Sequence, residues 1–224
     1  MIYRDRAEAG EQLASALTTW RGRNPLIVAI PRGAVPMGRI LAERLHGELE
    51  VVLTRKLRAP GNPEFAIGAV DETGWTYLAD NASEAGASRQ YIEREVVTEL
   101  ETIRRRRAMY TPDRPPIDAA GRVVIVVDDG LATGATMIAA LHAMRARGPQ
   151  RLICAAPVAS LEAVEKVRAY ADEVVCLQTP ELFYAVGQFY RSFPQIDDEE
   201  VIALLRSGGE SRAGRIGDAG KAGR

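Results

Sequence analysis

Two carboxylates follow directly after an apolar stretch of this chain, and a loop rich in glycine and threonine follows the carboxylates. The apolar stretch is residues 123–127, the acids are Asp128 and Asp129, and the loop is residues 130–136. Free N–H groups at the start of a helix bind phosphate, and glycines let the backbone approach a ligand. Carboxylates accept hydrogen bonds from sugar hydroxyls or hold a magnesium-bound ligand. These residues therefore indicate a site for a phosphorylated sugar.

An ordinary buried strand followed by a capped helix would explain the apolar run alone, but not the two acids followed by Thr-Gly-x-Thr. A P-loop is excluded because no Gly-Lys-Ser/Thr is present. The segment Val-Val-Ile-Val-Val-Asp-Asp-Gly-Leu-Ala-Thr-Gly-Ala-Thr resembles the phosphoribosyl-diphosphate (PRPP) binding signature of type I phosphoribosyltransferases. The resemblance implies a Mg²⁺-dependent enzyme in which Asp128 and Asp129 are catalytic, contact the ribose hydroxyls and help hold the metal. It assigns the 5-phosphate of PRPP to Ala132, Thr133, Gly134, Ala135 and Thr136.

A second loop, residues 31–36, follows the apolar run 26–30 and resembles the pyrophosphate-binding loop of the same family. Arg32 offers a forked cation to phosphate, and Gly33 permits a backbone conformation that exposes N–H groups. Arg55 and Lys56, which we expect at the end of a strand over 49–54, resemble the basic pair that some family members direct at PRPP. A Pro/Gly turn and a solvated pair of cations are the alternatives for these two segments.

The residue before Thr133 bears on the acceptor of the ribosyl group. In the 6-oxopurine enzymes of the family an acid stands there, whereas this chain has Ala132, so a hypoxanthine or guanine acceptor is disfavoured. The family often holds its acceptor by stacking under a variable hood, here residues 179–206. The aromatic side chains that could stack there are Phe183, Tyr184, Phe189 and Tyr190. Packing of these side chains against a C-terminal helix is an equally good explanation.

The composition excludes several classes of protein. The 224 residues are 46% apolar, which suffices for a core, and the net charge of -1 gives no general basis for binding nucleic acid. No apolar run approaches the roughly 20 residues of a membrane span, and the polar start does not resemble a signal peptide. A soluble, cytoplasmic protein is expected. Cys154 and Cys176 lie in apolar, strand-like contexts and are expected to be buried rather than paired.

Apolar, β-branched runs alternate with helical patterns along most of the chain. Strands are expected near residues 26, 49, 123, 151 and 173, with helices between them. This alternation predicts an α/β fold with a doubly wound, mainly parallel sheet, as the family resemblance also implies.

An insertion over residues 59–110 interrupts the alternation. It is expected to contain a hairpin around residues 71–74 and a helix over 88–110, whose four arginines at 104–107 are expected to be a solvated helix end. The family resemblance makes residues 61–78 a lid over the substrate. We expect one domain over residues 1–206 and a disordered tail over 207–224.

Two functional hypotheses follow. The first is a phosphoribosyltransferase that transfers ribose 5-phosphate from PRPP to an unidentified, nitrogenous acceptor and releases pyrophosphate. The chain is most similar to uncharacterised bacterial phosphoribosyltransferases that share Pro-Arg-Gly-x-x-Pro and Arg-Lys-Leu-x-x-Pro-Gly-Asn-Pro-Glu. The second is a non-catalytic regulatory protein that binds PRPP or a nucleotide. Family habit suggests a homodimer, and neither nucleic acid nor membrane is an expected partner.

Overall fold

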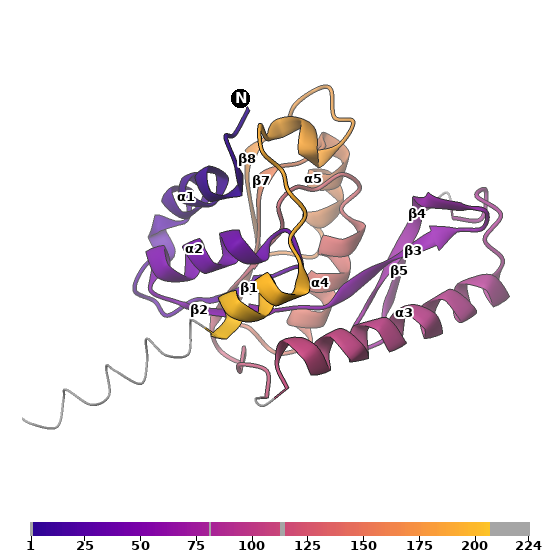
Figure 1. The fold of residues 1–224 in the computed structure, drawn as a ribbon, viewed down its shortest axis with the longest axis horizontal. Helices are drawn as coiled ribbons and strands as arrows, with labels where there is room; N and C mark the ends of the chain where they lie inside the picture. The colour runs from indigo at the N-terminus through magenta and orange to yellow at the C-terminus, as the bar shows by residue number, and fades with distance from the viewer. Residues whose placement is uncertain (1, 81, 113–114, 207–224) are drawn as a thin grey trace, which may run out of the picture.

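The computed structural model of the chain describes residues 2–80, 82–112 and 115–206 (Figure 1). A central sheet carries helices on both faces, and an arm of three strands and one long helix extends to one side. The tail predicted over residues 207–224 lies outside the described residues.

Five parallel strands form the central sheet, in the order β2-β1-β6-β7-β8. They are short and mostly apolar, as strands buried on both faces must be. The predicted doubly wound parallel sheet is confirmed. In this order β1 and β6 lie side by side, while the chain continues from β1 to β2 on one side and from β6 to β7 on the other. Ligands of such sheets usually bind at the point where the strand order reverses. The strands are β1 (Leu26–Ala29), β2 (Glu48–Val51), β6 (Val123–Val127), β7 (Arg151–Val158) and β8 (Glu173–Gln178).

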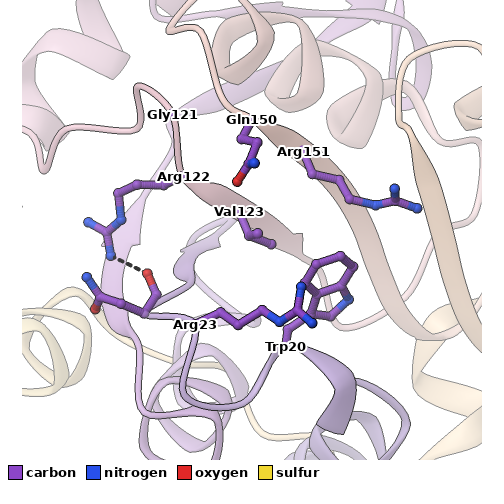
Figure 2. Close-up of a pocket in the computed structure, with 8 residues that line it drawn as sticks. Trp20, Arg23, Gly121, Arg122, Val123, Gln150 and Arg151 are labelled. Carbon is purple, nitrogen blue, oxygen red and sulfur yellow. Dashed lines mark hydrogen bonds between the residues drawn. The ribbon is translucent and has the colours of Figure 1, made fainter.

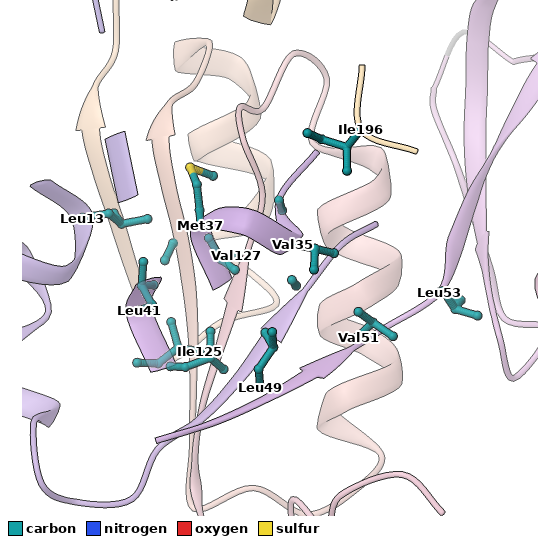
Figure 3. Packing of buried hydrophobic residues seen from close by; sticks show 14 of the residues in the cluster. Leu13, Val35, Met37, Leu41, Leu49, Val51, Leu53, Ile125, Val127 and Ile196 are labelled. Atoms are coloured by element: carbon teal, nitrogen blue, oxygen red, sulfur yellow. The ribbon is translucent and has the colours of Figure 1, made fainter. Parts of the chain in front are cut away.

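Alternate residues of the central strands pack against different helices. Ile125 and Val127 face α1 (Arg6–Ala16) and α2 (Val35–Leu45), where Leu13, Met37 and Leu41 meet them (Figure 3). The intervening residues Val124 and Val126 share a second core with α4 (Ala135–Arg145) and α5 (Leu161–Val167). Each fully buried Ile or Val contributes roughly 1.5–3 kcal/mol of transfer free energy. The two cores thus fix the strand ends from which the candidate site is built.

The arm is an antiparallel sheet of β3 (Thr54–Ala59), β4 (Asn62–Asp71) and β5 (Thr76–Leu78), covered by α3 (Arg89–Tyr110). The predicted hairpin around residues 71–74 and the predicted long helix are confirmed. The strand expected over 49–54 is wrong at its end: β2 stops at Val51, and the chain then enters the second sheet. The mixture of buried and exposed residues in β3 suits an antiparallel strand with one open face.

Contacts of Arg107 and of His142 anchor the arm to the body. Arg107 pairs with Glu72 at 2.8 Å and with buried Glu50 at 3.4 Å, and it donates to the carbonyl of Val51 at 2.9 Å. The expectation that residues 104–107 are all solvated is therefore wrong for Arg107. On the other side, His142 of α4 stacks on Trp75, with 3.9 Å between ring centroids, and its Nδ1 lies 3.1 Å from a carboxylate oxygen of Asp71.

Past β8 the chain crosses the carboxyl edge of the sheet and returns over the body. The 3-10 helix η2 (Val186–Phe189) lies in this segment, and residues 198–206 are helical. Tyr3 pairs with Tyr190, so the N-terminal segment, whose α1 is followed by η1 (Thr18–Trp20), lies beside the C-terminal one. We call residues 190–198 the C-terminal strap. The two cysteines are unpaired, Cys154 buried and Cys176 half-buried.

Candidate active site

A cavity of about 280 Å³ opens at the carboxyl ends of β1 and β6. Most of the predicted site residues line it, although they come from three separate stretches of the chain. Those brought together are Arg32, Gly33, Lys56, Asp128, Asp129, Ala132, Thr133, Gly134 and Thr136. The remaining lining residues are Ile30, Pro31, Gly130, Leu131 and Val186.

The loop between β6 and α4 is held by hydrogen bonds to the next βα connection. The N–H of Leu131 donates to the carbonyl of Val158 at 2.9 Å, and the hydroxyl of Ser160 donates to the carbonyl of Ala132 at 2.7 Å. Gly134 is the N-cap of α4 with φ 78°, a left-handed conformation that favours glycine. Gly134 has no capping side chain, and Gly134 and Thr136 line the cavity, so this 11-residue helix begins at the cavity, where the first N–H groups of a helix attract an anion. One of these groups, the N–H of Ala135, donates a long hydrogen bond of 3.5 Å to the Thr133 hydroxyl.

The two acids of the signature have different environments. Asp129 accepts from Nε of Arg6 at 2.9 Å, and Nη2 of Arg6 lies 2.9 Å from the same oxygen, Oδ2. The backbone carbonyl of Asp129 also accepts from the Tyr190 hydroxyl at 2.7 Å. Asp128 instead accepts from the N–H of Asp129 at 2.9 Å through Oδ1. Both acids line the cavity, but Asp129 is clamped by Arg6, whereas the hydrogen bond to Asp128 engages its Oδ1.

Burial raises the pKa of Asp128 well above its usual value, and the neighbouring charge of Asp129 raises it further. Burial also raises the pKa of Asp129, but the Arg6 guanidinium opposes that rise. Lys56 lowers the pKa of both acids by its positive charge. Of the two acids, Asp128 is thus the one that releases its proton less readily.

Arg6 is a site residue that the sequence pattern does not reveal. Its guanidinium packs over the ring of Phe193, 3.7 Å from the centroid, and donates to the carbonyl of Pro194 at 2.7 Å. Only 9% of the Arg6 side chain is exposed. In the sequence Arg6 is one of several charges in an amphipathic helix, and nothing near it indicates a partner that lies far along the chain.

The loop at the end of β1 packs directly on the acid pair. A Cβ placed on Gly33 would lie 2.0 Å from Oδ2 of Asp129, so only glycine fits at this position. The peptide bond between Pro31 and Arg32 is cis. Arg32 turns its Nη1 toward Oδ2 of Asp198 in the C-terminal strap, at 3.8 Å. The loop expected to hold the pyrophosphate of PRPP is thus in contact with the acid pair and lies beside the C-terminal strap.

The basic pair on β3 is divided between two sides of its strand. Lys56 lines the cavity, whereas Nε of Arg55 is 2.6 Å from Glu99 of α3. Successive residues of a strand point to opposite faces, which explains the separation. The structure therefore does not bring Arg55 to the predicted pyrophosphate site. Ala135 likewise has its side chain in a hydrophobic core, so only its backbone could meet a phosphate.

The aromatic residues proposed for the acceptor occupy different positions. Phe189 and Tyr190 are 8% and 6% exposed, the Tyr190 ring stacks on Phe193, and Phe183 packs against Phe189. Tyr184 is 82% exposed. None of these four is among the described residues that line the cavity, whereas Val186 is. Core packing, the alternative explanation, thus accounts for Phe189 and Tyr190.

A second cavity, of about 420 Å³, lies at the amino ends of β6 and β7 (Figure 2). Three arginines line it, and each contacts another side chain or the backbone. Arg122 donates to the carbonyl of Asn24 at 2.8 Å, Arg151 pairs with Glu173 at 3.0 Å, and Arg23 lies over the Trp20 ring at 5.4 Å. Figure 2 shows the guanidinium groups of Arg122 and Arg151 pointing away from each other. The described residues that line this cavity include no carboxylate and no helix N-terminus, so the chemistry suited to a sugar phosphate lies at the opposite edge.

Among the described residues no group of three or more His, Cys, Asp and Glu side chains is arranged to hold a metal ion. Within the same residues, no helix is both long and apolar enough to cross a membrane. A metal held by Asp128 and Asp129 would therefore need further ligands, such as water or the oxygens of a bound substrate.

Comparison with known proteins agrees with the geometry. The model of the phosphoribosyl transferase domain matches residues 3–193. A Mycobacterium tuberculosis (strain H37Rv) protein provisionally named phosphoribosyl transferase is 40% identical over 208 residues, which are 91% of this chain but 46% of that protein. The chain thus spans about half the length of the curated relatives that it matches.

A solved structure is similar over almost the whole chain. The crystal structure of TT1426 from Thermus thermophilus is 46% identical, with a TM-score of 0.77, and the match covers 93% of this chain and 99% of that one. Together with the parallel sheet, the strand-end cavity and the domain match, these similarities establish that the chain belongs to the type I phosphoribosyltransferase family.

Proposed function

We propose that this protein transfers ribose 5-phosphate from PRPP to a nitrogenous acceptor and releases pyrophosphate. The observation that supports this best is the single cavity at the β1 and β6 ends. It collects a helix N-terminus, two carboxylates, a Pro-Arg-Gly loop and a lysine. This set suits the charges of PRPP, which has a phosphate on C5 and a diphosphate on C1 of its ribose.

The 5-phosphate is assigned to the loop that opens α4. Backbone N–H groups of residues 132–136 and the hydroxyls of Thr133 and Thr136 provide the donors, and the helix dipole favours the negative charge. Because Gly134 and the bonds from Ser160 and Leu131 fix this loop, little rearrangement is needed to receive phosphate.

The ribose hydroxyls are assigned to the acid pair, with unequal roles. Arg6 occupies Oδ2 of Asp129, so Asp129 acts from a fixed position. Asp128 uses Oδ1 for a backbone N–H, which leaves Oδ2 for a hydroxyl. When the bond at C1 of the ribose breaks, the ring becomes cationic, and both carboxylates stabilise that charge.

The diphosphate is assigned to Arg32, the backbone at Gly33, and Lys56, whose cations offset the charge of the leaving group. Magnesium suits this donor set because carboxylate and phosphate oxygens are its preferred ligands, and the described residues alone provide too few. When bound, Mg²⁺ neutralises the diphosphate and makes it a better leaving group. The acids that could share it are Asp128 and Asp129.

The acceptor stays open, although Ala132 argues against 6-oxopurines. Val186 is the one residue of the hood, 179–206, among the described residues that line the cavity. It packs directly on Gly130, where an added Cβ would lie 2.5 Å from Cγ1 of Val186. A lid over residues 61–78, a homodimer and a cytoplasmic location also stay predictions. The described cavity lining contains no residue of 61–78, so a lid would have to close when substrate binds.

The test is release of pyrophosphate from labelled PRPP in the presence of Mg²⁺ and a pool of purine, pyrimidine and simpler amine acceptors. Release that depends on one acceptor supports the proposal, and ribose 5-phosphate in place of PRPP serves as the control. PRPP binding without turnover for any acceptor would instead favour the regulatory alternative, which Ala132 motivates. Absence of PRPP binding would contradict both.

A further inference from the structure

The C-terminal strap reaches the candidate site at two places. Its aromatic end supports Asp129, through the Tyr190 hydroxyl and through Phe193 and Pro194, which hold Arg6. Its far end brings Asp198, the first residue of the helix over 198–206, within 3.8 Å of Arg32. Asp198 is the carboxylate paired with the loop expected to hold diphosphate.

Asp198 is itself held by the end of α3. The hydroxyl of Tyr110 donates a short hydrogen bond to Oδ1 of Asp198, and Tyr110 is only 2% exposed. Burial, together with this bond to a carboxylate, raises the pKa of Tyr110, so its hydroxyl keeps the proton that it donates. The bond fixes one oxygen of Asp198 and leaves Oδ2 facing Arg32.

The contact leaves Arg32 free to bind a ligand. A guanidinium has five N–H donors, and Asp198 approaches one nitrogen, Nη1, at a distance beyond a hydrogen bond. About a third of each side chain is exposed, 34% for Arg32 and 31% for Asp198, so solvent screens the pair and its own contribution to stability is small. The value of the contact lies in the orientation of a flexible side chain at the cavity wall.

On the basis of the proposed function, we infer that Asp198 is a positioning residue that orients Arg32 toward the diphosphate of PRPP, with Tyr110 holding Asp198 in place. The chain Tyr110–Asp198–Arg32 thereby joins the arm helix α3 to the pyrophosphate loop through side chains from three distant segments. The 5-phosphate loop and the acid pair do not depend on this chain of contacts.

The substitution Asp198→Asn tests the inference with almost no change in shape. An asparagine oxygen can still accept from Tyr110, but an NH₂ group then faces the guanidinium, so a donor meets a donor. Calorimetric titration with Mg²⁺ and PRPP is expected to give a Kd about fivefold higher or more for this variant, in the range of couplings between contacting residues. Ribose 5-phosphate, which lacks the diphosphate, is expected to bind the variant and the wild type equally.

The matched control is Glu199→Gln, which removes the same charge one position along at an exposed residue and is expected to leave both affinities unchanged. In an Arg32→Gln background, Asp198→Asn is expected to have no further effect on PRPP, because the group that it orients is gone. Tyr110→Phe is expected to weaken PRPP binding in the same direction, and it provides a second variant if Asp198→Asn lowers the Tm.

The outcomes separate this inference from the proposed function. If the wild type binds PRPP and Asp198→Asn binds it equally or more tightly, the inference is overturned while the proposed function stands. Equal losses for PRPP and ribose 5-phosphate, or an undiminished effect in the Arg32→Gln background, would also overturn it, since both indicate a general structural defect. If the wild type does not bind PRPP, the proposed function and the inference fail together.

Discussion

Arg6 and Asp129 are 123 positions apart in the chain, yet Nε and Nη2 of Arg6 both lie 2.9 Å from the same carboxylate oxygen of Asp129. The pair is largely buried, with 9% and 15% of the two side chains exposed. A charge that loses its partner in such a place has neither water nor a counter-ion to stabilise it. The first helix of the chain is therefore part of the candidate site.

We expect Arg6→Gln to lower the free energy of unfolding by about 3–5 kcal/mol at neutral pH, as is typical when one partner of a buried ion pair is removed. Urea denaturation measures this loss, and Arg4→Gln, whose side chain is 72% exposed, is the control. Adding Asp129→Asn to Arg6→Gln is expected to recover much of the stability. Unchanged stability in Arg6→Gln would show that the pair is not formed in solution.

The single variant Asp129→Asn is expected to reduce PRPP use by about 100-fold or more, as for the loss of one electrostatic contact.

The close approach of Gly33 to Asp129 gives a second prediction. Gly33→Ala would put a Cβ 2.0 Å from Oδ2 of Asp129, so the loop or the carboxylate must move. We expect PRPP binding, measured by calorimetry, to weaken by at least about 10-fold, since small displacements at a site have large effects.

The control for Gly33→Ala is Gly121→Ala, which is strained because φ is 67° but has open space around it. Gly121 lines the second cavity, at the opposite edge of the sheet, and not the candidate site. It is expected to cost stability and to leave the Kd for PRPP unchanged. Normal PRPP binding by Gly33→Ala would contradict the packing of the pyrophosphate loop on Asp129.

Local sequence patterns are sufficient for the parts of the site that each lie within one stretch. The apolar run, the two acids and the Thr-Gly-x-Thr loop predict β6, its strand-end position and the start of α4, because these depend on neighbours in the chain. The alternation of strands and helices likewise predicts the central sheet.

Contacts between distant segments cannot be predicted in this way. Arg6 and Asp198 each look like an ordinary charge on an amphipathic helix, and only the fold shows that they face Asp129 and Arg32. The prediction that Arg55 and Lys56 both face PRPP assumes that they follow the end of a strand over 49–54. In the structure both residues lie within β3. The pleat of β3 separates the two side chains instead. Arg107 lies in a run of like charges whose partners, Glu50 and Glu72, come from other elements.

The raised pKa of Asp128 predicts a pH-dependent cost in stability. Above the usual carboxyl pKa of 3.8 the unfolded chain has lost this proton, whereas the folded protein retains it until a higher pH. The free energy of unfolding therefore falls as pH rises from 3.8 to the folded pKa, and the cost persists above that. We expect Asp128→Asn to be more stable than the wild type at about pH 7, with the difference vanishing below pH 3.8, in buffer with EDTA so that no cation shares the charge.

Asp172→Asn provides a control of opposite sign. Its hydrogen bond from Arg145 lowers the pKa of Asp172, so this carboxylate adds stability above its usual pKa of 3.8 and loses it as pH falls through the folded pKa. Thermal unfolding between about pH 3 and 8 should therefore move the two variants in opposite directions relative to wild type. A destabilised Asp128→Asn at neutral pH would contradict the burial of this acid.

The division of the basic pair on β3 gives the last prediction. Lys56→Met removes the cation that lines the cavity, and we expect the Kd for PRPP and for pyrophosphate, each with Mg²⁺, to rise by about 10-fold or more, as for loss of a charged contact to phosphate. Arg55→Met removes a cation one position earlier that instead pairs with Glu99. It is expected to leave both affinities unchanged and to destabilise the contact between β3 and α3, where Glu99 is 5% exposed. The two variants thus each replace one of two adjacent cations by Met, and they differ in which face of the strand is changed. Equal losses of affinity in both would mean that the basic pair acts as a general electrostatic field, in which case the side of β3 that faces the cavity has no special role.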